Sequence, residues 1–307
     1  MKTVLITGAY GFLGRFTALV FKKHNYRVIG IGHGQWGSEC PEQYGIDVWL
    51  ESSINHLTLR SIQEDLFCVV HCAGGSSVQS SLENPLEDYE KTVSSSIAVL
   101  EYIRVFHPKS RFIYPSSAAV YGSVANRQID ETFPVTPISP YGYYKNIVES
   151  LGRSYACNYD LPVSIIRFFS IYGEGLRKQL LWDACSRLSV DNKNAVEFYG
   201  DGTETRDWIH VKDAAELIFC CAISESKYEC VNGGDGVAIT NKRLLDLLSF
   251  EYGRGGSVAF NGLGRDGDPK YYWADISKAV ALGWKPQISL TEGIRRYVGW
   301  YKSKVTR

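Results

Sequence analysis

The chain has 307 residues, of which 45% are hydrophobic and 21% charged, and its 33 basic residues equal its 33 acidic residues in number. This composition is ordinary for a globular protein, and the zero net charge offers no basic excess, so we expect no nucleic-acid partner and no membrane surface as partner. No apolar run approaches 18 residues and the eight cysteines form no paired Cys-x-x-Cys units, so we expect no membrane span, no metal site and a cytoplasmic location.

Short β-rich runs alternate with helical patterns through the first half of the chain. The strand-like runs cover residues 2–7, 26–32, 44–50, 66–73, 111–117 and 163–169, and longer patterns such as 85–106 are helical. This alternation predicts an α/β fold, a doubly wound parallel Rossmann sheet. The pattern loosens after about residue 170, which predicts a smaller mixed α/β lobe. We assign residues 1–169, with about 206–232, to a dinucleotide-binding domain, and residues 170–205 and 233–307 to a substrate lobe.

The segment TGAYGFLG joins the first predicted strand to the first helix. Gly8, Gly11 and Gly14 have the spacing G-x-x-G-x-x-G, which suits a tight turn, a close backbone approach to a diphosphate and close packing of the helix on the sheet. The helix N-terminus adds free N–H groups and a positive dipole end. The motif therefore predicts a dinucleotide site that includes Tyr10 and, in the first helical turn, Phe12 and Leu13.

The end of the second predicted strand indicates which cofactor is preferred. An NAD site usually has Asp or Glu here, but this chain has Gly32 followed by His33. Without a carboxylate to repel a 2′-phosphate, we expect NADP(H) to be favoured, with NAD(H) as the open alternative. Asp47, which we place after the third strand, is a candidate for an adenine contact or a loop cap. The predicted cofactor-binding residues are Gly8, Tyr10, Gly11, Phe12, Leu13, Gly14, His33, Asp47, Val48, Ala73 and Lys145.

Three side chains suited to hydride chemistry follow the fifth strand. Ser116 and Ser117 end that strand, and Tyr141 and Lys145 lie four residues apart near the start of a helix, hence on one helix face. A neighbouring ammonium and a positive nicotinamide ring favour the phenolate, so we expect a lowered pKa for Tyr141. Tyr141 can then exchange a proton with a sugar hydroxyl or carbonyl, Ser117 can hydrogen-bond the same oxygen, and Lys145 can hold the nicotinamide ribose.

With these motifs in order, the chain resembles the extended short-chain dehydrogenase/reductase family, in particular its nucleotide-sugar epimerases, dehydratases and reductases. The stretches SSAAVYG, SPYGYYK, RFFSIYGEG and GDGTETRDWIHVKDAAE match that group almost end to end. The resemblance implies Ser117, Tyr141 and Lys145 as catalytic residues and a nucleotide-diphosphate sugar as substrate. It also implies a homodimer, and substrate contacts from Ser116, Ser170, Arg206 and Arg265.

Departures from the family pattern separate the possible reactions. Ala118 and Ala119 stand where 4,6-dehydratases usually carry Asp-Glu, which argues against dehydration, and Ser170 and Thr92 replace two frequent asparagines. We expect NADP(H)-dependent reduction of a 4-keto-6-deoxy sugar nucleotide at carbon 4. The alternative is an NAD-dependent nucleotide-sugar 4-epimerase, and a distant third is a non-catalytic cofactor sensor of the same fold.

Overall fold

The computed structural model describes residues 1–190, 196–256, 258–263 and 270–305, and is built around one parallel sheet. The seven strands of this sheet follow the spatial order β11-β6-β5-β4-β1-β2-β3. All of their pairings are parallel, as the sequence predicts. The strands are β1 (Thr3–Thr7), β2 (Arg27–Gly32), β3 (Val48–Glu51), β4 (Leu66–His71), β5 (Arg111–Ser117), β6 (Val163–Phe168) and β11 (Tyr228–Gly233).

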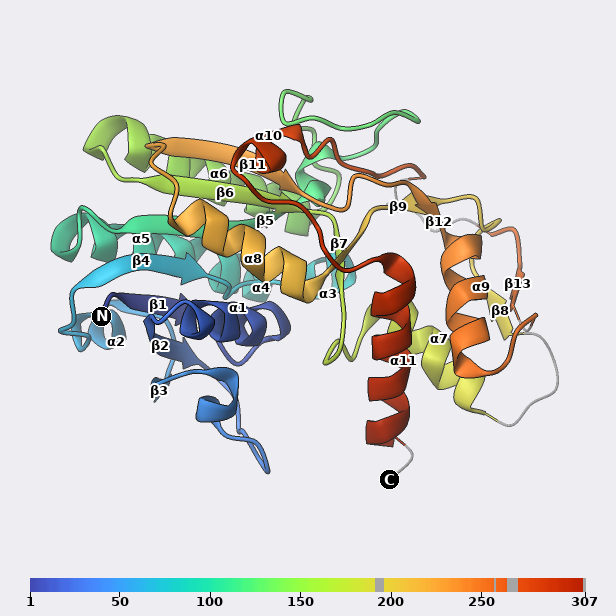
Figure 1. The fold of residues 1–307 in the computed structure, drawn as a ribbon. Coiled ribbons are helices and arrows are strands. Elements are labelled where there is room, and N and C mark those ends of the chain that lie inside the picture. The colour runs from blue at the N-terminus through green and yellow to red at the C-terminus, as the bar shows by residue number, and fades with distance from the viewer. Residues whose placement is uncertain (191–195, 257, 264–269, 306–307) are drawn as a thin grey trace.

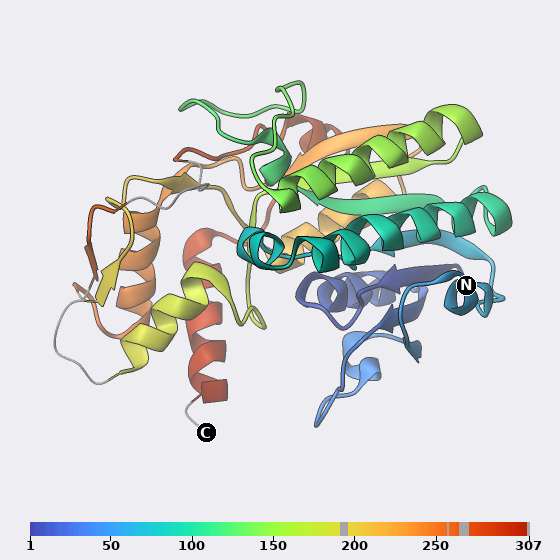
Figure 2. The same cartoon turned by 180° about the vertical axis from the view of Figure 1, so that it is seen from behind.

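Helices cover both faces of the sheet because alternate strand residues point to opposite sides. Val4 and Ile6 of β1 pack toward α1 (Phe12–Lys23) and α8 (Val211–Ala222) in one buried cluster. Leu5, between them, belongs to a second cluster with α5 (Ser95–Phe106) and α6 (Pro140–Tyr159). Figure 1 shows α1 and α8 in front of the sheet, and Figure 2 shows α5 and α6 on its other face. The predicted doubly wound Rossmann architecture is confirmed.

A second lobe lies beyond the ends of the strands (Figure 1). Its buried cluster joins Leu181, Leu244 and Ile294 from three helices. These helices are α7 (Gln179–Ser189), α9 (Asn241–Tyr252) and α11 (Leu290–Val305). Three short strand pairs lie outside the seven-stranded sheet: β7 (Ser170–Tyr172) with β10 (Trp208–His210), β8 (Val196–Phe198) with β13 (Val258–Phe260), and β9 (Thr205–Arg206) with β12 (Ile239–Thr240).

The buried cores refine the predicted boundary between the two lobes. Ala279 of α10 (Ser277–Ala281) and Trp284 belong to the sheet-side cluster with α1 and α8, although we assigned 233–307 to the substrate lobe. The Trp284 indole donates a hydrogen bond of 3.0 Å to the Asp213 carbonyl in α8. In the described part of the chain, no helix combines the length and apolar character that crossing a membrane requires.

Candidate functional site

The glycine turn after β1 has a shape that lets part of another molecule approach the backbone closely. Gly8 adopts φ +65°, and a Cβ there would lie 2.7 Å from the Ala73 nitrogen. A Cβ on Gly14 would lie 2.3 Å from the Gly8 carbonyl oxygen. The cap residue of α1, Gly11, makes no side-chain cap bond, so the first N–H groups of this helix face the turn. The turn therefore fits a dinucleotide diphosphate.

The end of β2 lies beside this turn. The strand ends at Gly32 and His33 follows it, exposed, with its Nε2 3.2 Å from the Ser53 hydroxyl. The Tyr10 ring covers Gly34 so closely that a Cβ there would lie 2.3 Å from the ring. The predicted strand end is therefore correct, and Tyr10 and His33 flank the position where an adenosine ribose is expected.

Asp47 and Val48 do not lie with the other predicted cofactor residues. Asp47 precedes β3, and its carboxylate accepts hydrogen bonds from the Val28 backbone N–H at 2.9 Å and from the Lys22 ammonium at 2.5 Å. Val48 pairs with Ile29, three residues before the end of β2. Since ligands bind at the carboxyl ends of the strands, the prediction for Asp47 and Val48 conflicts with the structure. Asp47 is a loop cap, which was the open alternative.

Ser117, Tyr141 and Lys145 come together where β5 meets α6. Ser117 is the last residue of β5, and Tyr141 and Lys145 lie in the first turns of α6. Ser139 caps this helix, because its hydroxyl accepts a hydrogen bond of 3.2 Å from the Gly142 N–H. The Ser117 hydroxyl is near enough to Tyr141 to lower the pKa of its phenol. The Lys145 ammonium lies 5.6 Å from the centre of the Tyr141 ring. The structure thus brings together the predicted trio.

Burial dominates the electrostatics of the trio. Lys145 is only 6% exposed, and its ammonium donates a hydrogen bond of 3.1 Å to the Pro115 carbonyl and lies 4.7 Å above the Tyr114 ring. Burial lowers the pKa of Lys145 to about 8. Burial also raises the pKa of Tyr141, against the opposing effect of the Ser117 hydroxyl. The neighbouring ammonium alone does not lower the Tyr141 pKa, because the phenol is withdrawn from water while the ammonium is directed to a carbonyl; the lowering expected from the nicotinamide ring stays a prediction.

Ser116, predicted to contact substrate, points away from the trio. Its hydroxyl donates a hydrogen bond of 2.5 Å to Glu149, and the residue is 4% exposed. Glu149 in turn pairs with Arg167 at 2.7 Å, with both side chains buried. Because neighbouring strand residues point to opposite faces, Ser117 and Ser116 cannot both face the site. Ser116 therefore belongs to the buried network of Glu149 and Arg167 and not to the site, contrary to the prediction.

The residues after Ser117 have no acid–base function. Ala118 and Ala119 begin a short 3-10 helix, Ala118–Tyr121, which Ser117 caps by accepting a 3.2 Å hydrogen bond from the Ala119 N–H. Methyl side chains cannot donate or accept a proton. The argument from sequence against a 4,6-dehydratase is therefore supported by the position of both alanines next to the Ser117 hydroxyl.

The second lobe meets the glycine turn directly. Phe12, the first residue of α1, packs on the second-lobe cluster, and the Lys178 ammonium donates a 3.1 Å hydrogen bond to the Ser76 carbonyl beyond β4. Ser170 begins β7, and Arg206 in β9 donates to the Thr205 carbonyl at 2.8 Å. Arg265, the remaining predicted substrate contact, lies outside the described residues.

Three acidic or imidazole groups of the TRDWIHVKD segment hold distant parts of the chain together. Asp207 accepts hydrogen bonds from the N–H groups of Ala274 and Gly236, both at 3.0 Å. His210 bonds Glu174 at 2.9 Å, and Asp213 accepts a 2.9 Å bond from the Ile288 N–H. Each bond joins segments distant in the chain, which fixes the two lobes relative to each other.

One group beside the trio was not found from the sequence. Asp88, in α4 (Pro85–Tyr89), is 5% exposed, and its charge acts on both Tyr141 and Lys145. Its neighbours in sequence are polar and exposed, so the pattern marks it as a surface residue. Gly75 is the one residue in the sequence that hints at this burial, because a Cβ at that glycine would lie 1.6 Å from the Asp88 Oδ1 atom.

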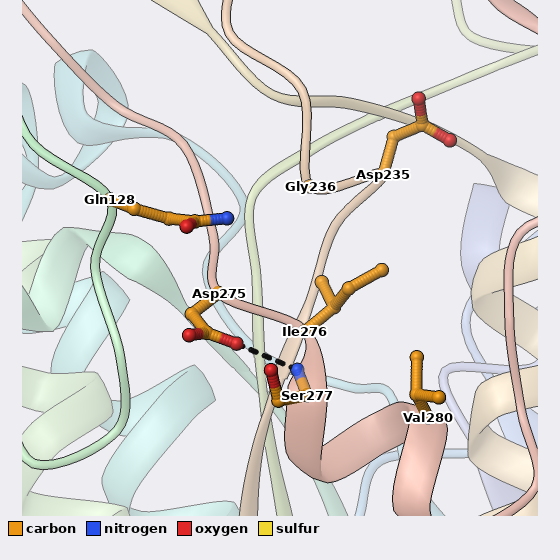
Figure 3. A pocket seen from close by; sticks show the side chains of 7 residues that line it. All are labelled: Gln128, Asp235, Gly236, Asp275, Ile276, Ser277 and Val280. Carbon is orange, nitrogen blue, oxygen red and sulfur yellow. Dashed lines mark hydrogen bonds between the residues drawn. The ribbon is translucent and has the colours of Figure 1, made fainter.

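A pocket of about 350 Å³ lies away from the trio, at the start of α10 (Figure 3). Asp275 lies in it and accepts a 2.8 Å hydrogen bond from the Ser277 N–H. Its lining comprises Gln128, Asp235, Gly236, Asp275, Ile276, Ser277 and Val280, which include none of the predicted site residues. Within the described residues no cluster of three or more His, Cys, Asp or Glu has metal-binding geometry.

Comparison with known proteins places these features in a family context. Residues 4–232 match the NAD dependent epimerase/dehydratase family. The chain is 31% identical, over 98% of both chains, to a Methanocaldococcus jannaschii protein provisionally named UDP-glucose 4-epimerase.

Solved structures share the fold over almost the whole chain. The UDP-glucose 4-epimerase of Thermotoga maritima with UDP-glucose superimposes with a TM-score of 0.89 at 26% identity, covering 99% of this chain and 100% of that one. The UDP-glucuronic acid 4-epimerase of Bacillus cereus, in complex with UDP-glucuronic acid and NAD, gives a TM-score of 0.87 at 25% identity, covering 98% and 99%.

Proposed function

Because the chain belongs to the NAD dependent epimerase/dehydratase family, we propose that it is a nucleotide-sugar 4-epimerase that acts on a UDP-hexose with NAD. The observation that carries this proposal is the trio of Ser117, Tyr141 and Lys145 beside the glycine turn, with alanines at 118 and 119. The three relatives compared above cover nearly the whole chain and are named as 4-epimerases, and both solved structures among them hold UDP-sugars. This supports our alternative better than the 4-keto reductase that we favoured from sequence.

Each member of the trio has a distinct task. The Tyr141 phenolate oxygen would take the proton of the sugar 4-hydroxyl and later return it to the same oxygen, once carbon 4 is reduced from its other face. Ser117 donates a hydrogen bond to the same sugar oxygen, and Lys145 stabilises the phenolate. When bound in the glycine turn, NAD supplies reversible hydride acceptance at carbon 4. The proton and hydride are both returned, so no net oxidation results.

The second lobe is the proposed site of the nucleotide and its diphosphate. Ser170 and Arg206 lie on the short strands that face the sheet edge, and Arg265 completes the set from the sequence. A guanidinium matches the geometry of phosphate oxygens.

The surroundings of Tyr10 support NAD over NADP. Arg15 lies 4.3 Å from the Tyr10 ring and donates a 2.7 Å hydrogen bond to the Tyr10 carbonyl, so it is a cation close to the ribose end of the turn. This guanidinium already pairs with Glu39 at 2.8 Å. The Glu39 carboxylate would repel a 2′-phosphate, and the Tyr10 ring fills the space over Gly34. The absence of an acidic residue at position 32 is therefore not enough to make the protein prefer NADP.

We also propose a homodimer, formed through α4 and α6, and retain a cytoplasmic location. Large apolar side chains are exposed on these neighbouring helices: Leu86 is 69% exposed and Tyr143 54%. Figure 2 shows α6 on the outer face of the molecule, where a second copy has access. Scattered apolar residues are common on surfaces, but an apolar patch on adjacent helices favours a protein contact.

The test is to release and identify the nucleotide of the purified protein, then assay UDP-glucose, UDP-glucuronate and UDP-N-acetylglucosamine for conversion to their 4-epimers. We expect bound NAD and turnover of one of these sugars. Tyr141→Phe should lose at least about a hundredfold in kcat with NAD retained. The matched control is Tyr143→Phe, an exposed tyrosine two residues along the same helix.

Two results would contradict the proposal. Tight NADPH binding with oxidation of NADPH by a 4-keto-6-deoxy sugar nucleotide would restore the reductase. Bound cofactor with no turnover of any sugar nucleotide would restore the sensor.

A further inference from the structure

The Asp88 carboxylate is buried without the partner that such burial normally requires. The residue is 5% exposed, and no described residue hydrogen-bonds its Oδ2 atom. Its Oδ1 atom occupies the position where Gly75 would carry a Cβ, at 1.6 Å. Burying a carboxylate is unfavourable unless a nearby charge or dipole compensates it. Burial accordingly raises the pKa of Asp88, and the charges of Lys145 and Lys91 oppose that rise.

Lys145 is a buried cation on α6, the helix that α4 contacts. Among the effects of neighbouring charges on the Asp88 carboxyl, that of Lys145 is larger than that of the exposed Lys91. Lys145 has three N–H donors, and its described hydrogen bond, to the Pro115 carbonyl, uses one of them. Asp88 and Lys145 lie on α4 and α6, which are in contact: Tyr89, next to Asp88, packs edge to face on Tyr144, next to Lys145, with ring centroids 5.5 Å apart.

The other groups around Lys145 cannot neutralise its charge. Burial raises the pKa of Cys72 of the β4 end to about 12, so this thiol stays neutral. Tyr114 of β5 contacts the Lys145 ammonium only with the face of its ring, and burial raises the pKa of its phenol well above the ordinary value. Glu149, on the same helix as Lys145, is engaged by Arg167 at 2.7 Å. Asp88 is the acidic group that remains.

The local backbone holds Asp88 in this position. The π-helical turn Glu90–Ser94 directly follows α4, and π-helical turns are frequent at functional sites. Thr92 in this turn accepts a 2.8 Å hydrogen bond from the Gly75 N–H. The helix and the glycine segment after β4 are thereby fastened together, with the Asp88 carboxylate between them.

We propose that Asp88 is a positioning residue of the site, the counter-charge that keeps the Lys145 ammonium protonated and seated beside Tyr141. The inference rests on the proposed function for its catalytic consequence, but not for the charge pairing itself. Gly75 is needed for the same arrangement, because any larger residue would displace the Asp88 carboxylate.

The direct test reads the charge of Lys145 without any substrate. Protein carrying ε-¹³C-lysine is titrated by NMR, with the Lys145 signal assigned from its loss in Lys145→Arg. In Asp88→Asn, which keeps the side-chain shape, we expect the Lys145 midpoint to fall by about one pH unit or more, because an opposite charge at this range shifts a pKa by roughly 1–3 units. Gly75→Ala should cause a similar fall although the carboxylate is retained.

Activity gives the second readout. Removing or displacing the Asp88 charge should move the descending limb of the kcat–pH profile to lower pH in both variants, with NAD content unchanged and cooperative unfolding retained. Glu90→Gln is the matched control, an exposed carboxylate two residues away that should change neither readout. An unchanged Lys145 midpoint in folded Asp88→Asn overturns the inference. A shifted midpoint without turnover of any UDP-sugar leaves the pairing intact and contradicts the epimerase.

Discussion

Ser116 and Ser117 are adjacent in β5, yet one donates a hydrogen bond to a buried carboxylate and the other acts on the pKa of Tyr141. We expect Ser117→Ala to lower kcat by about 10²–10³-fold with little effect on stability, because it removes a donor to the reacting oxygen. Ser116→Ala should leave kcat within about twofold and destabilise the fold by about 1–3 kcal/mol, since a buried charged acceptor loses its partner. Steady-state kinetics and urea unfolding of both variants check this. The reverse pattern would return Ser116 to the site.

Lys145 makes the protein less stable than it could be. Its pKa is lowered to about 8 by burial, so the native state holds this proton less tightly than the unfolded chain does. The penalty is complete below pH 8 and disappears as the pH rises toward 10.5. Lys145→Met should therefore abolish activity and remove this pH dependence, so that its free energy of unfolding relative to wild type is higher at pH 7 than at pH 10 by an amount on the order of 1–3 kcal/mol.

The measurement for Lys145→Met is denaturant unfolding at pH 7 and pH 10. The free energy of unfolding relative to wild type should be lower at the higher pH. Lys109→Met, at an exposed lysine, is the control and should show no such pH dependence. An equal difference between Lys145→Met and wild type at both pH values would contradict the penalty.

At the scale of elements, two helical glycines have opposite requirements. A Cβ on Gly14 in α1 would lie 2.3 Å from the Gly8 carbonyl oxygen, whereas one on Gly299 in α11 meets no atom within 4 Å. We expect Gly14→Ala to weaken NAD binding by more than about tenfold, measured by calorimetry. Gly299→Ala should instead stabilise the protein by about 0.5–1 kcal/mol, because alanine favours a helix. Equal NAD affinity in both variants would disprove the role of the turn.

Periodicity predicts the elements of this fold better than the position of single side chains within them. The uniformly apolar runs of β4 and β6 reflect burial on both faces, and the glycine spacing sets the first turn. The extended run 44–50 reads as one continuous strand, so the start of β3 at Val48 is not apparent from the sequence. Asp47 is therefore predicted at the wrong end of the strand. Asp88 could not be found this way, because its burial depends on Gly75, a contact between distant segments.

For the whole molecule, the exposed apolar face of α4 and α6 predicts the oligomeric state. Light scattering should give twice the 34.4 kDa chain mass. The double variant Leu86→Lys/Ile147→Lys should give the single chain mass, because two buried ammonium groups oppose association. Phe250→Lys, at an equally exposed apolar residue of α9 in the second lobe, is the control and should remain dimeric. A wild-type monomer would contradict the proposed dimer.

The place of β11 in the chain governs the order in which the protein can be made. This edge strand pairs with β6, but about sixty residues, including β7, α7 and α8, separate the two. A nascent chain leaving the ribosome therefore presents the hydrogen-bonding edge of β6 uncovered until residue 233 has emerged. Unpaired strand edges invite aggregation. Truncation at residue 169 would make that exposure permanent, so the dinucleotide-binding half is not separable by a simple C-terminal deletion.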